Sequence, residues 1–156
     1  MKTLVKINVS TLVDYEKWKA ANLENWDISK YLNQFYDINA ALALSKLYFP
    51  DFIEVNGCVV LLQRYDEQIF NQWHREFNGV ISLIEEKCNL YEVADLFHIN
   101  EVEYPTSEIY NEVIAGLANA LKISWELNLK HLFLDRQFKV HVYDEYGSTY
   151  ITIHSL

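Results

Sequence analysis

The side chains best spaced for acid–base chemistry lie near the C-terminus of the sequence. Residues 138–154 alternate between apolar and polar types around a central turn, which predicts a hairpin with His141 across from Tyr150 on one face. A histidine beside a tyrosine can exchange protons near neutral pH, and Tyr143 shares this face. We interpret His141, Tyr143 and Tyr150 as the lining of a pocket for a small molecule. Cross-strand aromatic pairing explains the same pattern equally well.

Other residue types that could support catalysis do not form a recognisable motif. Asp95 and His98 are spaced for two metal ligands on one helical face, but a zinc site needs three or four ligands. Cys58 and Cys88 have no catalytic motif beside them, and the sequence contains no GxSxG pattern and no glycine-rich phosphate loop. We therefore predict no catalytic residue, no metal site and no cofactor, and we lean toward a protein that is not an enzyme.

The most informative stretch of the sequence carries negative charge alone. Between Lys87 and Lys122 there is no Lys or Arg. The acidic residues of this stretch are Glu92, Asp95, Glu101, Glu103, Glu108 and Glu112. Glu108 and Glu112 lie near the start of a predicted helix, where the helix dipole offsets the repulsion between like charges four residues apart. Glu101 and Glu103 have no comparable structural explanation.

This acidic stretch indicates a surface that contacts a basic protein. Its tyrosines also favour contact, since aromatic residues are enriched at interface hot spots. The predicted surface consists of Glu101, Glu103, Tyr104, Glu108 and Glu112. An ordinary solvated face is the alternative interpretation. The formal net charge of −9 argues against nucleic acid and anionic membranes as partners.

Two hairpins and a long helix are the strongest structural signals. Asn56-Gly57 lies between two apolar, β-branched runs, which predicts a hairpin over residues 52–62 whose second strand is central in its sheet. An apolar stripe predicts a helix over about 107–133. Gly116 inside that helix costs about 1 kcal/mol relative to Ala, so we expect it to permit close packing.

Shorter elements complete the prediction. Residues 4–9 alternate as a short strand does, and Asp27, Asp37 and Asp66 are typical helix caps. Residues 80–87 and 91–97 are predicted to be helical. In the hairpin over 138–154 we expect facing residues to have numbers that sum to 291, which puts both apolar sets on one side. We predict an α+β fold in which the two hairpins and the N-terminal strand form one antiparallel sheet, packed with several helices.

Composition sets the broad class of the protein. Apolar residues make up 51% of the 156 residues and aromatic residues 15%, which supplies a substantial core. We predict a single domain over residues 1–156. No apolar run approaches the ~18 residues of a membrane-spanning helix, and the first residues lack a secretory signal, so we expect a cytoplasmic protein.

Two segments resemble those of a family of small acidic uncharacterised bacterial proteins. They are Leu44 to Cys58 (LSKLYFPDFIEVNGC), and the alternation from Phe138 to Ile153 that follows the helix containing Trp125. In size, acidity and lack of a catalytic motif the chain also resembles the immunity proteins of bacterial toxin systems. That second resemblance is one of type and assigns no functional residue.

We therefore predict a non-enzymatic acidic binding protein, of the kind that docks and inhibits a basic protein. One alternative is a small-molecule-binding protein or enzyme with its pocket near the C-terminal hairpin. A further alternative is a structural homo-oligomer.

Overall fold

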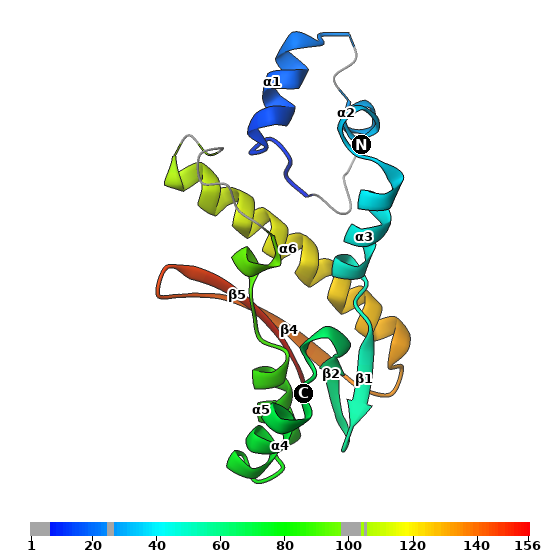
Figure 1. The fold of residues 1–156 in the computed structure, drawn as a ribbon, viewed down its shortest axis with the longest axis vertical. Coiled ribbons are helices and arrows are strands. Elements are labelled where there is room, and N and C mark those ends of the chain that lie inside the picture. Colours follow the sequence, from blue (N-terminus) through cyan, green and yellow to red (C-terminus); the bar gives the residue numbers. More distant parts are fainter. Residues whose placement is uncertain (1–6, 25–26, 98–103, 105) are drawn as a thin grey trace.

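The computed structural model describes residues 7–24, 27–97, 104 and 106–156, and within them the chain forms helices and two antiparallel sheets (Figure 1). The α-helices are α1 (Val13–Ala21), α2 (Ile28–Phe35), α3 (Ile38–Tyr48), α4 (Glu67–Glu76), α5 (Ile81–Cys88) and α6 (Ser107–Leu132). The strands are β1 (Phe52–Val55), β2 (Cys58–Leu61), β3 (Tyr91–Glu92), β4 (Phe138–Glu145) and β5 (Ser148–Ser155). Two short 3-10 helices are η1 (Leu62–Arg64) and η2 (Val93–Leu96). The predicted α+β class is confirmed.

Local sequence signals explain most of the helix starts. The side chains of Asp27, Asp37 and Asp66 accept hydrogen bonds from backbone N–H groups in the first turns of α2, α3 and α4. These bonds satisfy amides that have no partner inside the helix. Thr106 does the same for α6, whose observed span of Ser107–Leu132 matches the predicted long helix. These elements were predictable because each cap lies within a few residues of the amides that it binds.

The two hairpins form as predicted but belong to separate sheets. β1 and β2 make a two-stranded sheet, and the other sheet has the order β3-β5-β4. The prediction of one shared sheet is therefore wrong. So is the prediction that β2 is a central strand, because β1 is its only strand neighbour in the described chain. The strand is nevertheless fully buried, since side chains of α5 and of its C-cap residue Asn89 cover its second edge.

The third strand of the larger sheet comes from a segment predicted to be helical. Residues 91–97 form β3 followed by η2, because the backbone of Tyr91 and Glu92 pairs with β5. The predicted N-terminal strand over residues 4–9 is not confirmed: residues 4–6 lie outside the described residues, and residues 7–9 are not in a strand. There Val9 instead accepts a turn hydrogen bond from Leu12 and packs on the α1–α2 cluster.

The register of the C-terminal hairpin differs from the predicted one by two residues. Facing residues have numbers that sum to 293, as in Val140 opposite Ile153 and Tyr143 opposite Tyr150. A shift of two leaves every side chain on its predicted face, because the side-chain period of a strand is two. The apolar set therefore still lies on one side, where it packs on α6.

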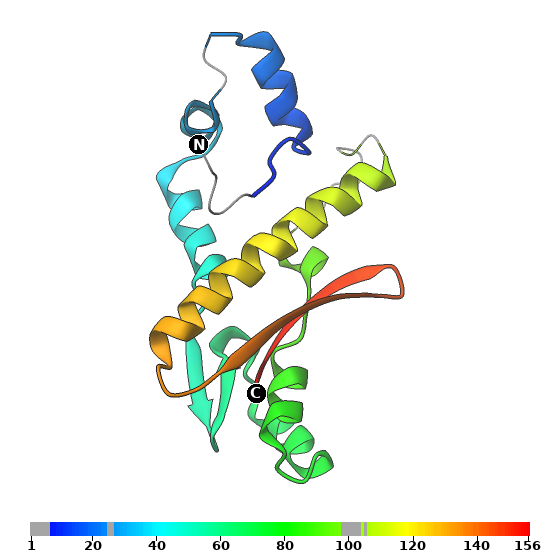
Figure 2. The ribbon, with the colours of Figure 1, turned by 180° about the vertical axis from the view of Figure 1, so that it is seen from behind.

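The main core lies between α6, the larger sheet and β2. Its largest fully buried member is Trp125, whose indole N–H donates to the carbonyl of Leu47 at the end of α3 (2.8 Å). A second cluster packs α4 and α5 on the other face of β2, around Phe70. A third is aromatic and joins α1 to α2 through Tyr15, Trp18 and Tyr31. Figure 2 shows α6 running diagonally alongside the hairpin of β4 and β5, with α1 and α2 at one end of the molecule.

Candidate functional site

The start of α6 carries the described part of the predicted partner surface. Glu108 and Glu112 are both exposed, one turn apart on the same helix face. Among the described residues, no cationic side chain lies within 4.0 Å of either carboxylate. Tyr104 is half-buried, and its ring meets that of Tyr110 edge to face at 5.3 Å between centroids. Glu101 and Glu103 lie outside the described residues.

The remaining acidic residues of the cation-free stretch are divided between two elements. Glu92 is in β3, where it pairs with Tyr150, and Asp95 is exposed on η2. The two do not share the face of one α-helix, since the local backbone is a strand followed by a 3-10 turn. Glu92 is thereby brought to the sheet face that carries the predicted pocket residues.

The predicted pocket residues form a row of rings on the sheet face opposite α6. Tyr143 stacks on Tyr150 at 5.6 Å between centroids, and His141 contacts Tyr143 at 5.1 Å. His141 itself lies opposite Thr152 rather than Tyr150, a consequence of the shifted register. The pocket interpretation of these three residues stays a prediction.

Electrostatics determine what this row can do near neutral pH. Partial burial, together with the nearby carboxylates of Glu145 and Glu86, raises the pKa of the Tyr143 hydroxyl above its ordinary value. Both causes disfavour the phenolate. The phenol is therefore protonated at neutral pH and can donate a hydrogen bond or offer its ring face, but it is a poor general base. Rings flanked by carboxylates suit contact with cationic groups.

The turn of the C-terminal hairpin presents a tyrosine that sequence reasoning missed. Tyr146 is 97% exposed and has a left-handed backbone (φ 50°), followed by Gly147 (φ 85°). The first hairpin has nearly the same turn, with Asn56 (φ 49°) and Gly57 (φ 80°). Asn is the residue that such a turn favours, and a bulky aromatic is disfavoured there. The signal in the sequence was an aromatic residue where a turn residue is expected.

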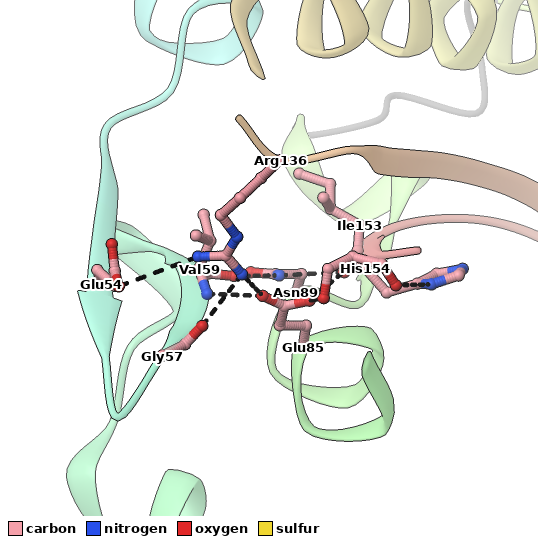
Figure 3. Close-up of polar contacts among 9 residues, drawn as sticks. Glu54, Gly57, Val59, Glu85, Asn89, Arg136, Ile153 and His154 are labelled. Carbon is pink, nitrogen blue, oxygen red and sulfur yellow. Dashed lines mark hydrogen bonds and ion pairs between the residues drawn. The ribbon is translucent and has the colours of Figure 1, made fainter. Parts of the chain in front are cut away.

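A buried polar network, shown in Figure 3, connects the two sheets and was not predicted. Glu85 is fully buried and accepts hydrogen bonds from the amides of Val59 (2.8 Å) and Ser155 (2.6 Å). Arg136 donates to the same carboxylate at 3.2 Å and to the carbonyl of Gly57 at 3.0 Å. Both carboxylate oxygens of Glu85 are thus hydrogen-bonded within the protein, which gives the residue a structural role.

Asn89, the residue that follows α5 at its C-terminal cap, completes this network. Its amide oxygen accepts from the Leu61 N–H, and its amide nitrogen donates to the carbonyls of Val59 and Ile153. The side chains of Glu85 and Asn89 therefore bond the free edge of β2 as a neighbouring strand would. A sequence signal existed in the two polar residues spaced four apart beside apolar Ile84 and Cys88.

The cysteines are placed for packing rather than for reaction. Cys58 and Cys88 are both buried and unbridged, and burial raises the pKa of each thiol to about 11. At neutral pH they are thiols, which are weak nucleophiles. In the part of the chain that is described, no three His, Cys, Asp or Glu residues converge as metal ligands. No helix described here combines the length and apolar character of a membrane span.

Comparison with known proteins adds no relative: no family model, no curated protein and no solved structure matches the chain. The resemblance to immunity proteins is therefore untested by these comparisons.

Proposed function

We propose that the protein is a non-enzymatic binding protein that docks a basic protein through an acidic surface at the start of α6. The acidic surface comprises Tyr104, Glu108 and Glu112, together with Glu101 and Glu103 from the adjoining sequence. The observation that carries the proposal is the exposure of Glu108 and Glu112 without a cation within 4.0 Å in the described chain. Carboxylates without a nearby cation can attract the cationic side chains of a partner protein.

The neighbouring hairpin supports this proposal. The turn of β4 and β5 and the first turns of α6 lie on the same side of the molecule (Figures 1 and 2). Asp144 and Glu145 precede the exposed ring of Tyr146 at that turn. An exposed aromatic among carboxylates offers both a contact area and a complementary charge to lysine or arginine side chains.

The partner class that we favour is a basic toxin, which the protein would inhibit by covering its surface. The acidity of the chain supports this choice, because a formal net charge of −9 favours encounter with a basic surface. Electrostatic complementarity would chiefly accelerate association and make it sensitive to salt.

Affinity capture from the source organism tests the proposal. Immobilised protein is incubated with cell extract at low ionic strength, and bound proteins are eluted with salt and identified by mass spectrometry. We expect a basic protein that is retained by the natural chain and lost by the double variant Glu108→Lys/Glu112→Lys. The matched control is Glu67→Lys/Glu76→Lys, which changes the net charge equally at two exposed positions of α4.

The control separates a specific surface from net charge. Figure 1 places α4 at the end of the molecule far from the start of α6. If the control double variant lost the partner to the same extent, binding would depend on overall charge, and the proposed surface would be wrong. Capture of no basic protein at low salt would likewise contradict the proposal.

A homo-oligomer is a second candidate, favoured by one observation. Ile38 is 83% exposed, Leu42 is 72% exposed, and Phe49 is also exposed beyond the end of α3. Exposed apolar side chains gathered on one element mark contact sites in many proteins. Light scattering of the purified chain at micromolar concentration tests this, with Leu42→Glu as the variant. A monomeric mass for the natural chain would exclude the oligomer.

A further inference from the structure

A cleft lies between α6, α3, η2 and the chain that precedes α1. It is separate from the sheet face that carries His141, Tyr143 and Tyr150. Its volume is about 480 Å³. Its lining is mostly apolar and includes Asn8, Leu44, Tyr48, Phe97, Gly116 and Leu117. No described residue that lines it carries a charge. Sites for small molecules are typically clefts of ~300–1,000 Å³ with mostly apolar walls and a few polar groups.

The cleft results from the way α3 meets α6. Hydrogen bonds join the two helices where α3 ends: Trp125 donates to the Leu47 carbonyl, and the Ser124 hydroxyl donates to the Tyr48 carbonyl. From this junction the helices diverge toward the start of α6, as both ribbon views show. The chain around Asn8 and the 3-10 turn of η2 close the remaining sides.

Gly116 gives the cleft its depth. It lies within α6, where glycine weakens a helix relative to alanine, and its backbone does not need positive φ. A Cβ built on Gly116 would meet the Asn8 carbonyl oxygen at 3.9 Å, an ordinary contact. A side chain is therefore sterically allowed at this position. Its absence leaves open space in the wall of the cleft, and close helix packing does not explain the glycine.

We propose that this cleft binds an uncharged, predominantly apolar small molecule. A charged ligand would lose its hydration without gaining an ionic partner, because the described lining residues offer none. An anionic ligand would also be repelled by the net charge of −9. The hydroxyl groups of tyrosine and threonine in the lining can bind an isolated polar group of such a ligand.

A matched pair of fluorescent probes tests both the site and its charge preference in the full-length chain. N-phenyl-1-naphthylamine is uncharged, and 8-anilinonaphthalene-1-sulfonate has the same ring skeleton with an added sulfonate. We expect saturable binding of the uncharged probe with one site per chain, and binding of the sulfonate at least tenfold weaker. Equal affinity for the two probes, or no saturable binding of the uncharged one, would overturn the proposal.

Substitution at Gly116 tests the location. Gly116→Phe should weaken binding of the uncharged probe at least tenfold by filling the cleft, whereas Gly116→Ala should bind nearly as well as the natural chain. Leu42→Ser is the control for binding to the exposed side chains of α3, and it should leave the affinity unchanged. Circular dichroism and thermal melting establish that each variant is folded.

Amide chemical shifts of the natural chain keep the test decisive if Gly116→Phe does not fold. The uncharged probe should perturb the amides of Leu44, Phe97 and Gly116 most strongly. Perturbations centred on Ile38 and Leu42, or on the C-terminal hairpin, would place the probe elsewhere and overturn the proposal. Tyr104 belongs to both the cleft lining and the acidic surface, but none of these variants changes Tyr104 or an acidic residue, so the failure of one proposal leaves the other intact.

Discussion

Glu85 is the residue on which the junction of the two sheets depends most. A fully buried carboxylate is unfavourable unless it is paired and hydrogen-bonded, and here two amides, one hydroxyl and one guanidinium bind it. The sequence showed an ordinary helical glutamate, because its partners come from segments 26 to 70 residues away. Single-residue reasoning could not have identified this role.

Removal of the Glu85 carboxylate should therefore be costly. We expect Glu85→Ala to lower the free energy of unfolding by about 3–5 kcal/mol, since it leaves Arg136 and two backbone amides without this acceptor. Urea denaturation measures this directly. Glu126→Ala, which removes an exposed ion pair with Lys122, should cost less than about 1 kcal/mol. Similar losses for the two variants would contradict the assigned role of Glu85.

The buried thiols give a prediction about pH. Burial raises the pKa of Cys58 and Cys88 from 9.0 to about 11, so both stay protonated in the folded chain at pH values where they ionise in the unfolded chain. Their contribution to stability is intact below pH 9 and is lost as the pH rises from about 9 to about 11. At pH 8 a disulfide reagent should label the native thiols at least ~100-fold more slowly than the denatured ones. Comparable rates would be incompatible with this burial.

At the scale of elements, local sequence signals predicted turns and helix caps correctly, whereas the pairing of distant segments could not be predicted. The hairpin at Asn56-Gly57 and the capped helices α2, α3 and α4 formed as predicted, because turn and cap chemistry acts over two to four residues. The strand at Tyr91 could not be predicted in the same way, since its only reason to be extended is the edge of β5. Because this pairing is not local, the sequence predicted two hairpins but not that they lie in separate sheets joined through side chains of α5.

The turn at Tyr146 yields a prediction in which stability and binding change in opposite directions. Tyr146→Asn should raise the free energy of unfolding by about 0.5–1 kcal/mol, because asparagine accepts the left-handed conformation more readily. If the exposed ring contacts the partner, the same variant should weaken binding by about 2 kcal/mol or more. Urea denaturation and calorimetry measure the two effects. A variant that gains stability and binds normally would remove Tyr146 from the interface.

At the scale of the whole molecule, the distribution of charge matters more than its sum. Six carboxylates and no Lys or Arg occur between Lys87 and Lys122, and the fold brings Glu108 and Glu112 to the start of α6 and Glu92 to the sheet face beside the stacked tyrosines. The sequence predicted Glu108 and Glu112 as exposed, and the structure agrees. It could not predict that Glu92 joins the predicted pocket residues, because that proximity depends on the pairing of β3 with β5.

The rate at which the captured partner associates with the protein, measured by stopped-flow at rising salt concentration, is the most direct test of the acidic surface. For the natural chain and for Glu67→Lys/Glu76→Lys we expect fast association that slows steeply with salt. For Glu108→Lys/Glu112→Lys we expect slower association at low salt, by at least tenfold, and a shallower salt dependence. An association rate unchanged by the Glu108 and Glu112 reversal at low salt would contradict docking at the start of α6.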